Sequence, residues 1–139
     1  MLASNKVAIS SYRKAGVAAE AGRASPHKVV LALFDGALGR LAVAAGAIQR
    51  NELAMAGEEI STVLTILGSL QQSLDFDGGG DVAVNLDRLY DYMIQTLLKA
   101  NLNKDVDGIA EVRELLTVLR DGWSDAAVAT SAQQAAAAL

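Results

Sequence analysis

The densest group of polar and aromatic side chains in the chain is the stretch NLDRLYDYM, residues 85–93. Asp87 and Asp91 lie four residues apart, so on a helix they share one face, as two carboxyl groups of a general acid–base pair can. Nothing in the sequence supplies a pocket or a nucleophile beside them. A Ser/His/Asp arrangement would depend on His27, the single histidine. The sequence therefore favours a binding surface over an active site.

Two further groups could do chemistry, an acidic loop and a histidine. The loop DFDGGGD places Asp75 and Asp77 at positions 1 and 3 of a calcium loop, but position 12 is Leu86, where a bidentate glutamate is needed. A di-iron bundle requires two Glu-x-x-His pairs, which one histidine cannot supply. His27 as a phosphoryl acceptor is an alternative, although it lies beside the expected start of a helix, where a surface histidine is the simpler interpretation.

The composition excludes several classes of protein. The 139 residues include no cysteine, so there is no disulfide, zinc–thiolate site or thiol nucleophile. Residues 1–28 carry a charge of +4 and the remainder −8, which is unlike the basic face of a nucleic-acid-binding protein. The start lacks the apolar run of a signal peptide, and no stretch approaches 18 uninterrupted apolar residues. We expect a binding protein that is not an enzyme and needs no metal, cofactor, nucleic acid or membrane insertion.

Four segments carry the spacing of apolar residues that is typical of helices, and none alternates as a strand does. The first begins at Ser25, a good capping residue, and Pro26, which suits the first helical position, and it ends near residue 50. The second covers about residues 52–74. Asp81 and Asp105 are expected to cap the third and the fourth. The expected seams of these two are Val82, Leu86, Leu89, Met93 and Leu97, then Ile109, Val112, Leu116, Leu119 and Trp123.

Similar helix lengths and short connections predict an all-α fold, an antiparallel up-down-up-down four-helix bundle over residues 25–123. A basic segment with a short helix precedes the bundle, residues 1–24. An alanine-rich tail with high helix propensity but little to bury follows it, residues 124–139.

The apolar arc of the third segment is wider than one bundle seam requires. With Leu86 at 0° and about 100° per residue, Tyr90 falls near 40°, where its hydroxyl is expected to reach outward. Ile94 and Leu98 fall near 80° and 120°, and Tyr92 lies near 240° on the opposite flank. This surplus predicts a groove that receives another amphipathic helix.

The first segment shows the same surplus, with Leu31, Phe34 and Leu38 beyond its seam. Three occupants would satisfy such a surface equally well: an external helical partner, the chain's own N-terminal segment or tail, or a second copy in a homodimer. All three bury apolar area by the same physics, so the sequence leaves them open.

Several stretches together resemble the flagellar secretion chaperone family (FliS), the cytoplasmic chaperones of flagellin. They are Tyr12, ASPHKVVLALFDGAL at 24–38, SLDFDGGGDVAVNLDRLYDYM at 73–93, KANLNKD at 99–105 and EVRELLTVLRDGW at 111–123. The ordered combination of these motifs is specific. The linker between Tyr12 and Ser25 looks longer than is usual in the family, and the alanine-rich tail lies outside its pattern.

The resemblance implies a cytoplasmic chaperone that binds the C-terminal region of flagellin, prevents its premature polymerisation and delivers it to the flagellar type III export gate. It also implies that the segment bearing Ile9 and Tyr12, which share a helical face, covers the client groove or contacts the export machinery. The residues expected to contact partners are Ile9, Tyr12, Leu31, Phe34, Leu38, Tyr90, Tyr92, Ile94 and Leu98. The alternative is a generic helical adaptor or a self-associating bundle.

Overall fold

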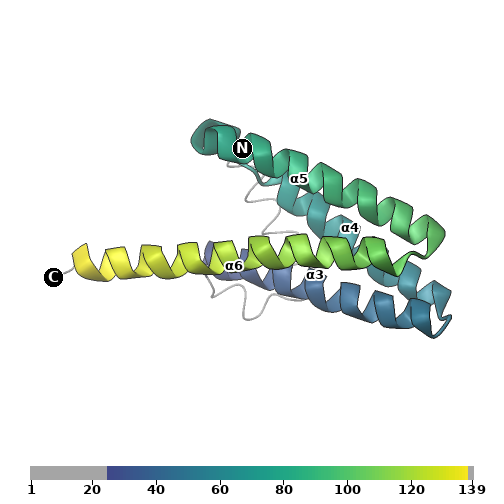
Figure 1. Ribbon diagram of the computed structural model, residues 1–139. Helices are drawn as coiled ribbons and strands as arrows, with labels where there is room; N and C mark the ends of the chain where they lie inside the picture. The colour runs from purple at the N-terminus through teal and green to yellow at the C-terminus, as the bar shows by residue number, and fades with distance from the viewer. Residues whose placement is uncertain (1–24, 138–139) are drawn as a thin grey trace.

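A computed structural model of the chain describes residues 25–137, and side-chain burial within it is described for residues 25–126. The described part consists of four helices and no strand: α3 (Pro26–Gln49), α4 (Leu53–Gln72), α5 (Phe76–Asn103) and α6 (Val106–Ala137). Each helix packs against the next, and α6 returns to pack against α3 (Figure 1). Connections of two or three residues make consecutive helices antiparallel. The predicted all-α bundle is therefore confirmed for these residues.

The start of α3 and the start of α6 follow the capping chemistry expected from the sequence. The Ser25 hydroxyl accepts a hydrogen bond from the backbone N–H of Lys28 at 3.3 Å, and Pro26 occupies the first turn. Before α6, Asp105 Oδ1 accepts from the backbone N–H of Asp107 at 3.0 Å. Both caps satisfy backbone donors that the helix leaves unpaired.

The start of α5 differs from the prediction. Asp75, rather than Asp81, caps the helix, and its carboxylate accepts from the backbone N–H of Gly78 at 3.0 Å. Gly80 then has φ of 52° and ψ of −127°, a backbone conformation that only glycine adopts readily. The glycine run therefore breaks α5 into a short first piece, capped by Asp75, and a main helix that begins after Gly80, where the sequence predicted a helix start.

The core is mainly aliphatic, as the low aromatic content predicts, with Phe34 and Tyr90 as its aromatic members. Its largest fully buried side chains are Leu41, Ile60, Leu67, Met93, Leu97, Ile109 and Leu116. The predicted α6 seam is confirmed, because Val112 is also fully buried and Leu119 and Trp123 pack against the core. Val82 was wrongly predicted as a core residue: it is 66% exposed, and the adjacent Ala83 is buried instead. Figure 1 shows that the beginning of α5 diverges from α6.

Helices α3 and α4 are long and apolar enough to cross a membrane when judged by length and composition alone. In each, 33% of the most apolar window is buried inside the bundle. The core helices of a bundle meet the same criterion, so the finding is weak evidence for a membrane span.

Helices α5 and α6 approach closely at Gly108, where an added β-carbon would lie 2.9 Å from the Ala100 β-carbon. We expect Gly108→Ala to lower the free energy of unfolding by about 1–3 kcal/mol, because the overpacking outweighs the better helix propensity of alanine. Urea unfolding measures this. Gly39→Ala is the matched control: no atom lies within 4 Å of its added β-carbon, so it should stabilise the chain by about 0.5–1 kcal/mol.

A compensating change separates the clash from other effects of the substitution. In the double variant Gly108→Ala/Ala100→Gly, the total loss should be smaller than the sum of the two single losses, because the opposing methyl group is gone. Additive losses, or a Gly108→Ala chain as stable as the parent, would contradict the close approach.

Candidate functional site

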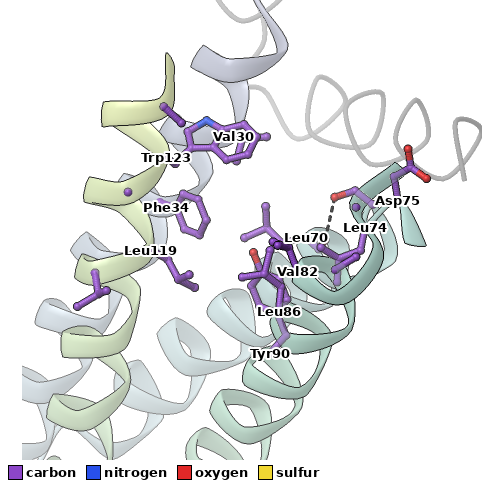
Figure 2. A pocket seen from close by; sticks show the side chains of 16 residues that line it. Val30, Phe34, Leu70, Leu74, Asp75, Val82, Leu86, Tyr90, Leu119 and Trp123 are labelled. Atoms are coloured by element: carbon purple, nitrogen blue, oxygen red, sulfur yellow. Dashed lines mark hydrogen bonds between the residues drawn. The ribbon is translucent and has the colours of Figure 1, made fainter. Parts of the chain in front are cut away.

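An apolar groove opens at the end of the bundle where α3 and α5 begin and α4 ends. Its volume is about 500 Å³, and all four helices contribute to its walls. Figure 2 shows one wall formed by side chains of α3 and α6 and the facing wall formed by side chains of α4 and α5. The labelled lining residues are Val30, Phe34, Leu70, Leu74, Asp75, Val82, Leu86, Tyr90, Leu119 and Trp123.

The groove is a consequence of how the helices diverge. Toward this end α5 separates from α6, so the α5–α6 seam opens instead of closing over the core (Figure 1). Val82 on α5 is 66% exposed and Val118 on α6 is 68% exposed, and both line the groove. Exposed apolar side chains around one concave surface are typical of a site that receives another molecule.

Trp123 is held in place on the groove wall by the start of α3. Its indole Nε1 donates a hydrogen bond to the backbone oxygen of His27 at 2.9 Å. The His27 ring lies against the indole, with ring centroids 4.8 Å apart and planes tilted by 34°. His27 is therefore half-buried beside the groove, which differs from the exposed position expected of a surface or phosphoryl-accepting histidine.

Tyr90 lies in the floor of the groove, which corrects the expectation that it would sit at the rim. Only 4% of the residue is exposed, and no hydrogen-bond partner of its hydroxyl is present among the described residues. Burial raises the pKa of Tyr90 to about 12, because the ionised form would lose its hydration. The phenol is protonated, and able to donate a hydrogen bond, at any physiological pH, and the shift keeps it protonated at more alkaline pH as well.

The raised pKa predicts how stability depends on alkaline pH. Between the ordinary pKa of 10.0 and the folded value of about 12, the unfolded chain loses the Tyr90 proton while the folded chain keeps it. The associated stability is complete below pH 10 and is lost as pH rises through 12, a change of up to about 3 kcal/mol. Urea unfolding of the parent and of Tyr90→Phe from pH 9 to 12 measures this loss. Lysines titrate in both chains over this range, so the difference between the two pH profiles isolates the contribution of Tyr90. Identical pH profiles would contradict the assignment.

The paired carboxylates of the NLDRLYDYM stretch bind the neighbouring helix rather than face a pocket. The Gln71 side-chain amide on α4 donates to Asp87 Oδ1 at 3.0 Å and to Asp91 Oδ1 at 2.6 Å. One amide therefore ties both carboxylates of α5 to α4. This arrangement gives the pair a structural role and provides no acid–base partner.

Tyr92 lies on a different face of α5 from Tyr90. It is 49% exposed, and its hydroxyl donates to the Glu111 carboxylate on α6. That hydrogen bond, followed by the charge of Glu111, raises the pKa of Tyr92. The two tyrosines thus do different things: Tyr90 lines the groove, and Tyr92 ties α5 to α6 on the outside.

The structure brings only part of the predicted contact set together. Phe34 and Tyr90 both line the groove, although Phe34 was expected beyond the helix seam, as an exposed or rim residue, and is only 3% exposed. The other described members lie outside it: half-buried Leu31, Leu38 and Ile94, and exposed Tyr92 and Leu98. Ile9 and Tyr12 lie outside the described residues.

Sequence reasoning missed the contributions of α4 and α6. Leu70 lies near the end of α4 and Leu74 just after it, and Leu119 and Trp123 come from the middle of α6. The bundle topology could have predicted them, because in an up-down-up-down bundle these segments lie beside the starts of α3 and α5.

A second hollow of about 420 Å³ lies between α5 and α6 toward the opposite end of the bundle. Most of its lining side chains are polar or charged, of both signs. The lining residues are Tyr92, Thr96, Lys99, Ala100, Asn103, Asp105, Asp107, Gly108 and Glu111. Among residues 25–126, no three histidine, cysteine or acidic side chains gather closely enough to hold a metal ion.

Comparison with known proteins places these features in a family. The sequence model of the family described as "Flagellar protein FliS" matches residues 8–130. The flagellar secretion chaperone FliSB of Pseudomonas aeruginosa is 39% identical over 116 residues, covering 84% of this chain and 92% of that protein. The flagellar secretion chaperone FliS of Salmonella typhimurium is 36% identical over 127 residues, covering 91% and 94%. The resemblance stated from the motifs is thus confirmed, and the chain belongs to the FliS family of flagellar secretion chaperones.

Proposed function

We propose that this chain is an export chaperone that binds the C-terminal region of flagellin through its apolar groove. In this role it keeps flagellin from polymerising prematurely in the cytoplasm and aids its delivery to the flagellar type III export apparatus. The observation that carries the proposal is the open groove of about 500 Å³, walled by all four helices, in a member of a flagellar secretion chaperone family.

The lining of the groove suits an amphipathic helical client. Val82 and Val118 present exposed apolar side chains, and Leu86, Leu119 and Trp123 lie half-buried between them and the core. A helix that lays its apolar face on such a surface removes both apolar faces from water. Filling this surface offsets the ordering entropy of a client that folds on binding, while a modest net affinity still allows release for export.

The predicted contacts outside the groove extend this surface. Ile94 and Leu98 lie further along α5, four residues apart and therefore on one face, and Leu98 is 47% exposed. We propose that a client leaving the groove continues along this face of α5. The segment with Ile9 and Tyr12 is proposed to cover the groove in the absence of client or to contact the export gate.

Calorimetric titration with a peptide of the flagellin C-terminal region from the same genome tests the proposal. We expect a one-to-one complex with a dissociation constant in the low micromolar range or tighter, and a gain of helical circular dichroism as the peptide folds. Absence of binding at tens of micromolar would contradict a flagellin chaperone. In that event, sedimentation of the free chain would distinguish the homodimer alternative from a generic adaptor.

A further inference from the structure

The polar side-chain groups along the groove differ in whether they have a partner. Ser73 Oγ donates to the Leu70 backbone oxygen at 2.8 Å, and the Trp123 indole donates to the His27 backbone oxygen at 2.9 Å. The Asp75 carboxylate, at the solvent-exposed end, accepts the backbone N–H of Gly78. The Tyr90 hydroxyl has no partner within the described part of the chain.

The Tyr90 hydroxyl lies where it can contact whatever occupies the groove. Tyr90 is only 4% exposed, yet it lines the groove, so its hydroxyl, which has no partner among the described residues, meets the groove's contents. Figure 2 shows its oxygen directed from α5 toward the space between the two walls, among Leu70, Val82 and Leu86. The labelled side chains beside Tyr90 on this wall, Leu70, Val82 and Leu86, are aliphatic.

An unpaired hydroxyl in an apolar surface discriminates between occupants. While solvent fills the groove, a water molecule can accept a hydrogen bond from the hydroxyl. An apolar occupant that displaces this water leaves the hydroxyl without a hydrogen-bond partner. An occupant that supplies an acceptor at the same place recovers the bond. Sites with such a buried polar group reject ligands that lack its counterpart far more strongly than purely apolar pockets do.

We infer that the Tyr90 hydroxyl is a specificity-determining group that requires the groove's occupant to present a hydrogen-bond acceptor within an otherwise apolar contact face. The inference rests on the proposed function, because it concerns how the groove recognises its client. The phenol is a hydrogen-bond donor throughout the physiological range, and burial, which raises the pKa of Tyr90 to about 12, extends this to more alkaline pH. The acceptor is either an amide or hydroxyl side chain of the client or one of its backbone carbonyl groups.

The test compares Tyr90→Phe with the parent chain in two measurements. The flagellin C-terminal peptide should bind Tyr90→Phe about 10-fold more weakly, because the client acceptor loses its donor. The melting temperature of the free chain should be unchanged or higher, because the deleted hydroxyl has no partner within the described chain. A merely structural role would lower the melting temperature together with the affinity. Thr65→Val is the control, since it deletes an exposed hydroxyl of α4 that bonds only the Ser61 backbone oxygen outside the groove.

Alanine substitution along the peptide distinguishes the two sources of the acceptor. If a client side chain supplies it, one substitution will weaken binding to the parent about 10-fold and leave binding to Tyr90→Phe unchanged. If a backbone carbonyl supplies it, no substitution will show this pattern, but the loss in Tyr90→Phe will remain. Either pattern supports the inference.

Two failures remain distinguishable. A parent chain that does not bind the peptide contradicts the proposed function. A parent chain that binds while Tyr90→Phe binds equally well, or melts at a clearly lower temperature, overturns the role of the hydroxyl and leaves the proposed function standing.

Discussion

Val82→Glu is expected to weaken binding of the flagellin C-terminal peptide by about 10–100-fold, or about 1.4–2.8 kcal/mol, while the bundle stays folded. Val82 is 66% exposed on the groove wall, so a carboxylate there remains hydrated in the free chain. A client that covers this position must remove the carboxylate from water without a partner, and it also loses the apolar contact of the valine. Calorimetry gives the affinity, and circular dichroism with thermal melting reports the fold.

Val43→Glu provides the matched control for this experiment. Val43 is 46% exposed on α3 and does not line the groove, so the same change of side chain should leave the affinity within about twofold. Val118→Glu, on the α6 side of the groove, should reproduce the loss, because Val118 is 68% exposed there. If Val82→Glu and Val118→Glu both bound the peptide as the parent does, the client would not occupy this groove.

Met93→Ala is expected to lower the free energy of unfolding by about 2–5 kcal/mol, a large part of the total stability of a domain of this size. Met93 is fully buried in the core cluster together with Leu97 and Ile109. Truncation removes its apolar contacts and leaves a cavity that the surrounding helices fill only in part. Urea unfolding followed by circular dichroism measures the loss.

Leu102→Ala is the comparison on the same helix. Leu102 is 83% exposed, so its truncation should change the free energy of unfolding by no more than about 0.5 kcal/mol. Similar losses for the two variants, or a loss below about 1 kcal/mol for Met93→Ala, would mean that α5 does not pack against the core through this face.

The helices were predictable because their signals are local. Ser25, Pro26 and Asp105 carry capping chemistry that acts within one turn, and the structure uses all three as expected. The α6 seam through Ile109, Val112 and Leu116 was predictable because its spacing of three and four residues has only one way to face a bundle core. The short helical piece capped by Asp75 was missed, because Asp75 and Asp81 are both good caps and the sequence does not show that the chain turns helical before the break at Gly80.

The groove was only partly predictable, because periodicity gives the direction of a side chain but not what it meets. Val82 belongs to the seam by its helical angle, yet it is 66% exposed, and the beginning of α5 diverges from α6. For Tyr90 and Phe34 the error has the opposite sign. Their helical angles placed them at the edge of the apolar face or beyond it, but both residues are buried. How far two helices separate depends on the packing of the whole bundle, which no short segment encodes.

The polar stretch at residues 85–93 depends on partners that are distant in sequence. Asp87 and Asp91 resemble an acid–base pair until Gln71, on the preceding helix, is found to bind both. Tyr92 is paired with Glu111 on the following helix, which leaves Tyr90 as the tyrosine that faces the groove. These pairings give the polar side chains of this segment structural roles between helices.

The central claim is that the flagellin C-terminal region binds in the groove, and the emission of Trp123 tests it most directly. Trp123 is the only tryptophan of the chain and lies on the groove wall, half-buried against His27. Titration with a tryptophan-free flagellin C-terminal peptide should shift its emission to shorter wavelength, because the client displaces water from the indole. The shift should saturate at one peptide per chain, with the dissociation constant found by calorimetry. Saturable binding by calorimetry with an unchanged Trp123 emission would contradict the claim.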